Sequence, residues 1–320
     1  MLENIKGELA RRLENSSGQE NLQKLYNNEV KIFFEALLAA RDIDDIAIQV
    51  KLKFIESMFN EHHYLEALEV LEELLANRGM LTEEELVRVL EQKGVALRMG
   101  GRYEESERLF KEMLESEFTW AKRKAYINLG ITYCYLTKHT GKKVLTEAQQ
   151  FFLKAQDLLE PGDSEDRFQI SFYMATIYFE KGRFGECLKA LEIALNQAPT
   201  DQQRAMVFNE LARVSIAESK LEIAGAYLDQ AEHILTRRSH YHELALAWNL
   251  HIRGLWNKKK GEYTNAINCL ELALNTFVER ELFSEAAEVS YELYALNKFL
   301  ENGDADEYLA DYQYYSRMIS

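Results

Sequence analysis

Asn128 and Asn209 are the two residues whose chemistry best suits the recognition of another polypeptide chain. A carboxamide both accepts and donates hydrogen bonds, so it can hold one peptide unit of an extended segment without reading its sequence. Aromatic rings and guanidinium groups supply much of the binding energy at protein interfaces. The candidates of this second kind are Phe172, Tyr173, Arg213 and Trp248. Residues of these types suit the binding of a peptide where the fold places them on one surface.

The sequence contains no group of residues that predicts catalysis or a metal site. His62 and His63 are followed by Glu66, but a histidine and a carboxylate at the start of an acidic helix are common on protein surfaces. Four further histidines fall around one connection between helices, and only His251 is expected to face inward; they are His233, His240, His242 and His251. The motifs GxxxxGK[ST], GxGxxG, HExxH and GxSxG are all missing. We therefore expect neither an enzyme nor a bound cofactor.

Charge and hydropathy exclude further classes of partner. The net charge of −15 disfavours direct binding to nucleic acid, whose phosphates attract basic surfaces. No apolar run approaches the roughly 18 residues that a membrane span needs, and the first residues lack a hydrophobic signal region. The three cysteines, Cys134, Cys187 and Cys269, form no CxxC pair and fall on apolar stripes. We expect a cytoplasmic protein whose cysteines are reduced core residues.

The segment from Phe168 to Pro199 shows which elements position these side chains. It predicts two amphipathic helices joined by a tight turn at residues 181–183. Small residues recur where two antiparallel helices must approach closely, and bulky residues fill the space between them. The small residues are Ala175, Cys187 and Ala194; the bulky ones are Tyr178, Phe184 and Leu191.

The same pattern recurs along most of the chain. An aromatic or aliphatic residue opens the second helix of each copy, at Tyr64, Tyr103, Leu145, Phe184, Leu221 and Tyr263. The successive differences between these residue numbers are 39, 42, 39, 37 and 42. A fixed period of this length indicates a repeat protein, in which each unit buries its apolar face against its neighbours. With only 2 prolines in the chain, we expect an almost wholly helical solenoid.

The repeat resembles the tetratricopeptide repeat (TPR). Six signature positions match, at Ala175, Tyr178, Cys187, Leu191, Ala194 and Pro199. This resemblance implies an all-α, right-handed superhelical solenoid of about six to seven helical hairpins, closed by capping helices at both ends. We assign residues 1–42 to an N-terminal helical cap and residues 43–320 to the solenoid. The expected hairpins are 44–77, 83–117, 120–160, 164–198, 201–237, 240–279 and 282–318.

By analogy with TPR proteins, the second, fifth, sixth, ninth and thirteenth positions of each repeat line a concave groove. This register also turns Glu91 and Met99 inward. The candidate peptide-binding residues in the groove are Arg88, Lys124, Asn128, Tyr135, Phe172, Tyr173, Thr176, Met206, Asn209, Arg213, Trp248 and His251. The clamp by which some TPR domains hold acidic chaperone tails does not fit. It needs Lys and Asn in the repeat before Asn128, where Glu91 and Val95 stand, and Lys and Arg in the repeat after it, where Gln169 and Tyr173 stand.

The whole chain also resembles the peptide-sensing TPR domains of Gram-positive bacterial RRNPP regulators, including the Rap group. The likeness lies in a helical N-terminal segment, a period near 40 residues and a degenerate last hairpin, SYELYALNKFLENGDADEYL. It implies a bacterial regulator that binds a peptide. The first 42 residues show no helix-turn-helix, and they are shorter than the three-helix bundle of the Rap group.

Two functions from different classes therefore stay open. The first is a non-enzymatic module that binds a peptide or an extended protein segment in its groove. The second is an assembly scaffold that uses its convex face, its termini or a loop at residues 137–143, where hairpin three is six residues longer than hairpin four. A Rap-like regulator of response-regulator dephosphorylation is a third, weaker option, and a homo-oligomer also stays open.

Overall fold

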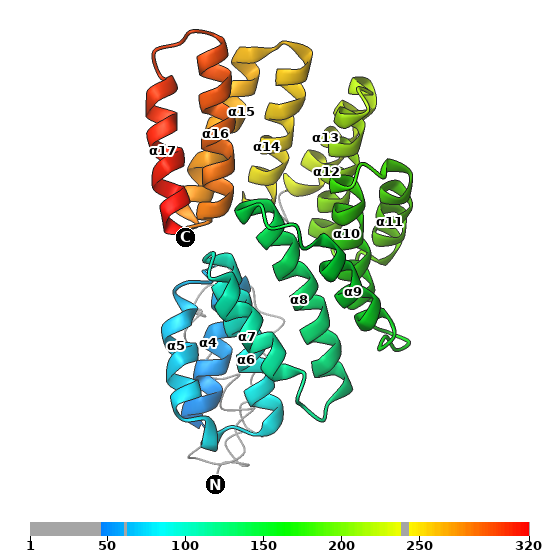
Figure 1. Cartoon of the computed structure of the whole chain (residues 1–320), viewed down its shortest axis with the longest axis vertical. Coiled ribbons are helices and arrows are strands. Elements are labelled where there is room, and N and C mark those ends of the chain that lie inside the picture. Colours follow the sequence, from blue (N-terminus) through cyan, green and yellow to red (C-terminus); the bar gives the residue numbers. More distant parts are fainter. Residues whose placement is uncertain (1–45, 61–62, 238–242, 320) are drawn as a thin grey trace, which may run out of the picture. The chain divides into compact units, whose positions relative to one another are not determined.

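The computed structural model describes the chain except for residues 1–45, 61–62, 238–242 and 320 (Figure 1). The expected cap at residues 1–42 lies outside the described residues. Within them, all regular structure is helical, with fourteen α-helices and one short 3₁₀ helix. This confirms the predicted fold class, an all-α solenoid of helical hairpins.

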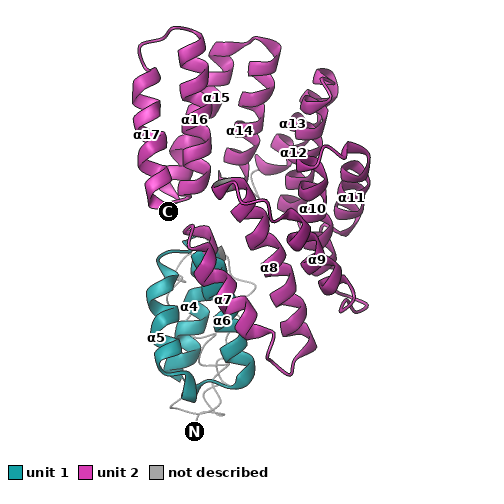
Figure 2. Ribbon diagram, in the orientation of Figure 1, with its two compact units in different colours: residues 1–97 teal, residues 98–320 magenta. Residues whose placement is uncertain are grey.

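The chain divides into two compact units at Leu97 and Arg98 (Figure 2). The helices of the first unit are α4 (Ile46–Asn60), α5 (Ala67–Ala76), η1 (Arg78–Met80) and α6 (Glu83–Met99), whose last two residues belong to the second unit. The second unit continues with α7 (Tyr103–Met113), α8 (Thr119–Thr140), α9 (Leu145–Gln156), α10 (Ser164–Glu180), α11 (Phe184–Gln197), α12 (Asp201–Ala217), α13 (Leu221–Leu235), α14 (Glu243–Lys260), α15 (Tyr263–Glu279), α16 (Phe283–Phe299) and α17 (Ala305–Met318).

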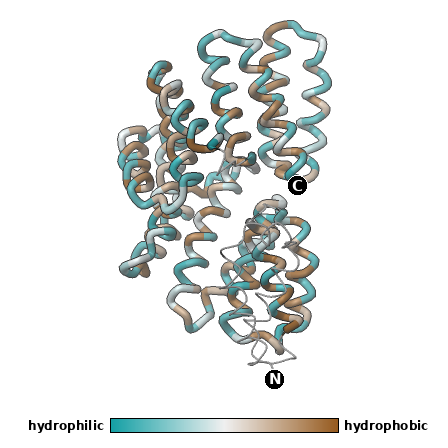
Figure 3. Tube along the Cα trace, turned by 180° about the vertical axis from the view of Figure 1, so that it is seen from behind, coloured by the Kyte–Doolittle hydropathy of each residue, from teal (hydrophilic) through white to brown (hydrophobic). Residues whose placement is uncertain are grey.

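The pair α10 and α11 shows how the repeat folds. Ala175, Cys187, Leu191 and Ala194 are all buried, as their positions on the two stripes predict. The turn between the helices depends on Gly182, whose φ of 68° suits a residue without a side chain. Hydrophilic and hydrophobic residues both occur along the helices (Figure 3), as expected where one face of a helix packs inward.

Gly130 allows α8 and α9, the helices of the hairpin that precedes α10 and α11, to approach each other closely. A Cβ atom on Gly130 of α8 would lie 2.6 Å from Cζ of Phe152 on α9. That contact is impossible without movement of a ring that is fully buried. The close approach of α8 and α9 therefore requires glycine.

Gly130→Ala is expected to lower the free energy of unfolding by about 1–3 kcal/mol, because the added methyl overpacks the interface. The matched control is Gly185→Ala on α11, where a Cβ would meet nothing within 4 Å. That change should stabilise the protein by about 0.5–1 kcal/mol, because alanine loses less backbone entropy in a helix. Thermal denaturation of both variants tests the pair, and equal melting temperatures would contradict the predicted contact.

The extra length of hairpin three is not a protruding loop, contrary to the sequence-based prediction for residues 137–143. The α8 helix continues to Thr140, so only residues 141–144 form a connection. The hydroxyls of Thr137 and Thr140 donate to the carbonyls of Tyr133 and Leu136, which keeps these threonines within the helix. Gly141 ends the helix in the left-handed conformation, with φ of 69°. The insertion thus lengthens α8 by about one turn and places Lys138 on a helix.

Helices α7 and α8, near the start of the second unit, contact α16 near its end. The hydroxyls of Tyr103 on α7 and Ser284 on α16 lie 3.0 Å apart. Lys138 at the end of α8 pairs with Glu288 on α16, with a distance of 2.6 Å from Nζ to Oε2. These contacts join segments that lie far apart in sequence within the second unit.

Candidate functional site

Arg98 lies at the centre of a polar and aromatic cluster in the second unit. Its guanidinium lies 5.8 Å from the centre of the Phe110 ring and 6.0 Å from that of Tyr135. Its Nη1 donates to Oδ1 of Asn128 at 3.0 Å and to the Asn128 carbonyl at 3.4 Å. Arg98 is only 6% exposed, and its Nε has no hydrogen-bond partner among the residues that the structure describes.

The charge of this arginine acts on the pKa of three tyrosines, and with it they form what we call the Arg98 cluster: Arg98, Tyr103, Tyr135 and Tyr173. The rings of Tyr103 and Tyr135 lie 6.4 Å apart, and Tyr173 stacks on Phe152 at 6.2 Å. Burial raises the pKa of all three hydroxyls, that of Tyr103 to about 12, whereas the charge of Arg98 acts in the opposite direction on each. The hydroxyls therefore stay protonated at neutral pH and can donate hydrogen bonds.

A second group, the Lys138 cluster, contains Lys138, Arg213, His251, Glu285 and Glu288. Glu285 is 5% exposed, and burial raises the pKa of its carboxyl to about 7, although Lys138 acts in the opposite direction. His251 is 8% exposed, burial lowers its pKa, and its Nε2 has no partner within the described part of the chain. Neutral histidine is therefore its form at physiological pH.

Arg213 on α12 connects the Lys138 cluster to α10. Its guanidinium stacks over Phe179 at 4.2 Å and pairs with Glu210 and Glu180 at 3.1 and 3.3 Å. The charges of Arg213 and Lys138 both act on the pKa of His251, and Glu285 acts on the pKa of Tyr135 and Tyr173. The two clusters are thus close enough to influence each other, and they draw on α6, α7, α8, α10, α12, α14 and α16.

The two asparagines singled out in the sequence already have partners within the protein. Asn128 is 5% exposed, accepts from Arg98 and donates to the Lys124 carbonyl at 3.1 Å. Asn209 is 4% exposed and accepts from Nδ2 of Asn249 at 2.8 Å. Their contact with a bound peptide stays a prediction, and in the structure both carboxamides join neighbouring hairpins.

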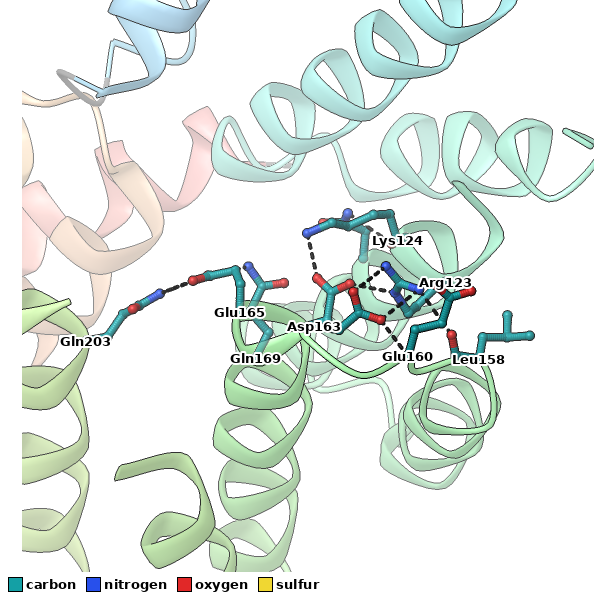
Figure 4. Close-up of polar contacts among 10 residues, drawn as sticks. Arg123, Lys124, Leu158, Glu160, Asp163, Glu165, Gln169 and Gln203 are labelled. Atoms are coloured by element: carbon teal, nitrogen blue, oxygen red, sulfur yellow. Dashed lines mark hydrogen bonds and ion pairs between the residues drawn. The ribbon is translucent and has the colours of Figure 1, made fainter. Parts of the chain in front are cut away.

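Lys124 is also engaged, as Figure 4 shows. Its Nζ lies 2.6 Å from Oδ1 of Asp166, whose other oxygen accepts from Nε of Arg123 at 2.6 Å. Arg123 additionally reaches Asp163 and the Leu158 carbonyl. This buried network fixes α8 against the start of α10.

Some of the other predicted residues belong to the two clusters, and the rest pack against neighbouring side chains or lie on the surface. Tyr135, Tyr173, Arg213 and His251 belong to the clusters defined above. Phe172 packs against Phe168, and Trp248 packs against Phe277. Met206 lies against the apolar core, and the Thr176 hydroxyl donates to its own helix. Arg88 is exposed in the first unit, where it pairs with Glu84.

Sequence reasoning missed Arg98, Lys138, Glu285 and Glu288. Arg98 lies seven residues, or two helical turns, after Glu91, so the register that turned Glu91 inward could have found it. Lys138 was assigned to a loop, and Glu285 and Glu288 lie in the degenerate last hairpin, where the register is weakest. No group of three histidine, cysteine, aspartate or glutamate side chains in the described residues could hold a metal.

None of the described helices is both long enough and apolar enough to cross a membrane. The cysteines are unpaired, and burial raises the pKa of Cys134 and Cys187 to about 12. These thiols are therefore protonated at neutral pH and act as small core residues.

No protein-family model matches the sequence, and a search of curated proteins finds no relative. Solved structures do resemble the chain. The Rap conjugation gene regulator of the plasmid pLS20, in complex with the Phr* peptide, aligns with a TM-score of 0.71 at 14% identity, over 99% of this chain and 95% of that chain. A Rap protein complexed with competence and sporulation factor gives 0.67 at 13% identity, over 99% and 92%.

A third structure, NprR in complex with its cognate peptide NprX, gives a TM-score of 0.62 at 18% identity, over 96% of this chain and 88% of that chain. At these identities the likeness concerns the fold. The alignments cover nearly the whole chain, and the helical hairpins described above are of the same kind. The chain therefore has the TPR-like helical-repeat fold of these structures.

Proposed function

We propose that this protein is a non-enzymatic peptide-binding module and that the peptide lies along the first helices of the second unit, across the Arg98 and Lys138 clusters. The observation that carries this proposal is the unused hydrogen-bonding capacity at its centre. Arg98 and His251 are each more than nine-tenths buried, and each keeps a ring or guanidinium nitrogen without a partner among the described residues. A buried polar group without a partner is costly, and a ligand that supplies one lowers the free energy.

The residue types in the clusters fit an extended peptide. Tyr135 and Tyr173 offer rings with hydroxyl donors, and Arg213 offers a guanidinium that is about one-quarter exposed. Aromatic residues and arginine are the types that dominate binding energy at interfaces. The structural likeness to regulators solved with bound peptides supports the same assignment, including a role as a bacterial regulator that responds to a peptide.

The test uses a library of random heptapeptides and the full chain immobilised on a support. Retained peptides are quantified by mass spectrometry. Tyr173→Ala and Arg213→Ala are each expected to lower retention about tenfold or more, because each removes a central contact group. The control, Lys189→Ala, changes an exposed lysine on α11 and should leave retention unchanged.

Thermal denaturation of each variant separates loss of binding from loss of folding. A wild-type chain that retains no peptide would refute the proposal. So would retention that survives both substitutions in folded protein, because the peptide would then lie elsewhere.

A further inference from the structure

Arg98 is a buried cation without a counter-ion. It forms no ion pair with any residue in the described part of the chain, whereas the other buried arginine, Arg123, pairs with Asp163 and Asp166. Moving a guanidinium out of water without a carboxylate partner costs several kcal/mol, of the order found for unpaired buried charges. The two ring faces and the Asn128 carboxamide offset only part of this cost.

Only one side of the Arg98 guanidinium is hydrogen-bonded to the described residues. Nη1 donates two hydrogen bonds, to the carbonyl and to the side-chain oxygen of Asn128. Nε is buried and has no partner in the described residues, and neither hydrogen bond to Asn128 uses Nη2. Nε and Nη2 form the edge that donates two parallel hydrogen bonds to a carboxylate. Asn128 therefore holds the guanidinium by one side, and the carboxylate-binding side makes no hydrogen bond to the described residues.

The surroundings favour an anion at this edge. Tyr135, whose ring centre lies 6.0 Å from the Arg98 guanidinium, and Tyr173 both have pKa values on which the charge of Arg98 acts. The Tyr173 hydroxyl is protonated at neutral pH and can donate to an oxygen beside Arg98. The acid that also acts on these tyrosines is Glu285, and its own strongest charge interaction is with Lys138. Glu285 and Glu288 both interact with Lys138, and neither forms an ion pair with Arg98.

We propose that the Nε–Nη2 edge of Arg98, assisted by the Tyr173 hydroxyl, binds a carboxylate of the peptide. This inference rests on the proposed peptide-binding function. Asn128 acts as a positioning residue, because it holds Arg98 and does not need to touch the peptide. The carboxylate is either the C-terminus of the peptide or an aspartate or glutamate side chain within it.

Three heptapeptide libraries distinguish these sources. The first has a free C-terminal carboxylate and no aspartate or glutamate, the second is identical but ends in a carboxamide, and the third ends in a carboxamide and contains one aspartate. The full chain is expected to retain one of the two carboxylate-bearing libraries about tenfold more strongly than the uncharged one, because a charge-assisted bidentate pair contributes at least a factor of ten.

Arg98→Met should abolish this preference, and Arg98→Lys should keep part of it, because lysine retains the charge but loses the fork. Tyr173→Phe keeps the ring, removes the hydroxyl and should reduce the preference to a smaller extent. Arg108→Met is the matched control, since Arg108 is an exposed arginine on α7. The wild-type comparison and Tyr173→Phe keep the test valid even if Arg98→Met does not fold.

The outcomes separate the two proposals. Equal retention of all three libraries by the wild-type chain would overturn the carboxylate site and leave peptide binding intact. A preference that Arg98→Met retains in folded protein would overturn the assignment to Arg98. Retention of none of the libraries would overturn the peptide-binding function together with this inference.

Discussion

Arg123→Met is expected to lower the free energy of unfolding by about 3–5 kcal/mol, because it leaves buried carboxylates without their cation. The Arg123 side chain is 8% exposed and that of Asp166 is 4% exposed. Nε of Arg123 lies 2.6 Å from Asp166, and Nη1 lies 3.0 Å from Asp163 (Figure 4). Lys124 still reaches Asp166 in the variant, so the expected loss is at the lower end of this range.

The control for this prediction is Arg204→Met, which breaks an exposed pair with Asp201 at 3.0 Å. An exposed pair contributes about 1 kcal/mol or less. The double variant Arg123→Met/Asp166→Leu should recover part of the stability, because it removes the carboxylate that the single variant strands. Urea denaturation followed by circular dichroism measures all three. A loss for Arg123→Met no larger than that for Arg204→Met would show that the network contributes little to stability.

The fold could be predicted from the sequence because the repeat records it several times. Residues such as Tyr103, Phe184 and Tyr263 mark the same structural position in successive copies, so an error in one copy is corrected by the others. Ala175, Cys187 and Ala194 are buried because close helix packing admits only small side chains there, which is a local requirement. Periodicity and residue size were sufficient for both conclusions.

The candidate site was predicted only in part, because it depends on contacts between copies. The sequence identified Tyr135, Tyr173 and Arg213 by register, but no register shows that Asn128 accepts from Arg98 or that Asn249 donates to Asn209. An asparagine in a repeat can hydrogen-bond either to a bound peptide or to a residue of the neighbouring hairpin, because its carboxamide both donates and accepts. The sequence alone does not distinguish these two roles.

The length of α8 was mispredicted for a different physical reason. A six-residue insertion that contains Gly141 and two threonines is typical of a loop. Threonine is nevertheless accommodated in a helix when its hydroxyl donates to the carbonyl four residues earlier, as Thr137 and Thr140 do. Because the helix continues, Lys138 reaches Glu288 on α16, a contact between helices near the start and near the end of the second unit that a loop would not have fixed.

Glu285 lies on α16, the helix that Lys138 contacts through Glu288, and its titration makes the free energy of unfolding depend on pH. Burial raises the pKa of Glu285 from 4.5 to about 7. The groups that face it are Lys138 on α8, Glu288 on its own helix, and the hydroxyls of Tyr103, Tyr135 and Tyr173, whose pKa values it raises. The folded state therefore binds a proton on Glu285 more tightly than the unfolded state does.

The contribution of Glu285 to the free energy of unfolding consequently falls as the pH rises. Below pH 4.5 the carboxyl is protonated in both states and carries no penalty. Between pH 4.5 and about 7 the unfolded state loses its proton first, so unfolding becomes easier, and above about pH 7 the whole penalty is present. The shift corresponds to roughly 3 kcal/mol.

Glu285→Gln removes this penalty, because the amide has a similar shape and does not ionise. The variant should match the wild-type chain near pH 4 and exceed its free energy of unfolding by roughly 3 kcal/mol near pH 8. Denaturation curves at intervals of one pH unit measure the difference, with Glu192→Gln on the exposed face of α11 as the control. A difference that stays constant from pH 4 to pH 8 would mean that Glu285 titrates normally, and the buried acid would then have to be paired with a cation more closely than with Lys138 alone.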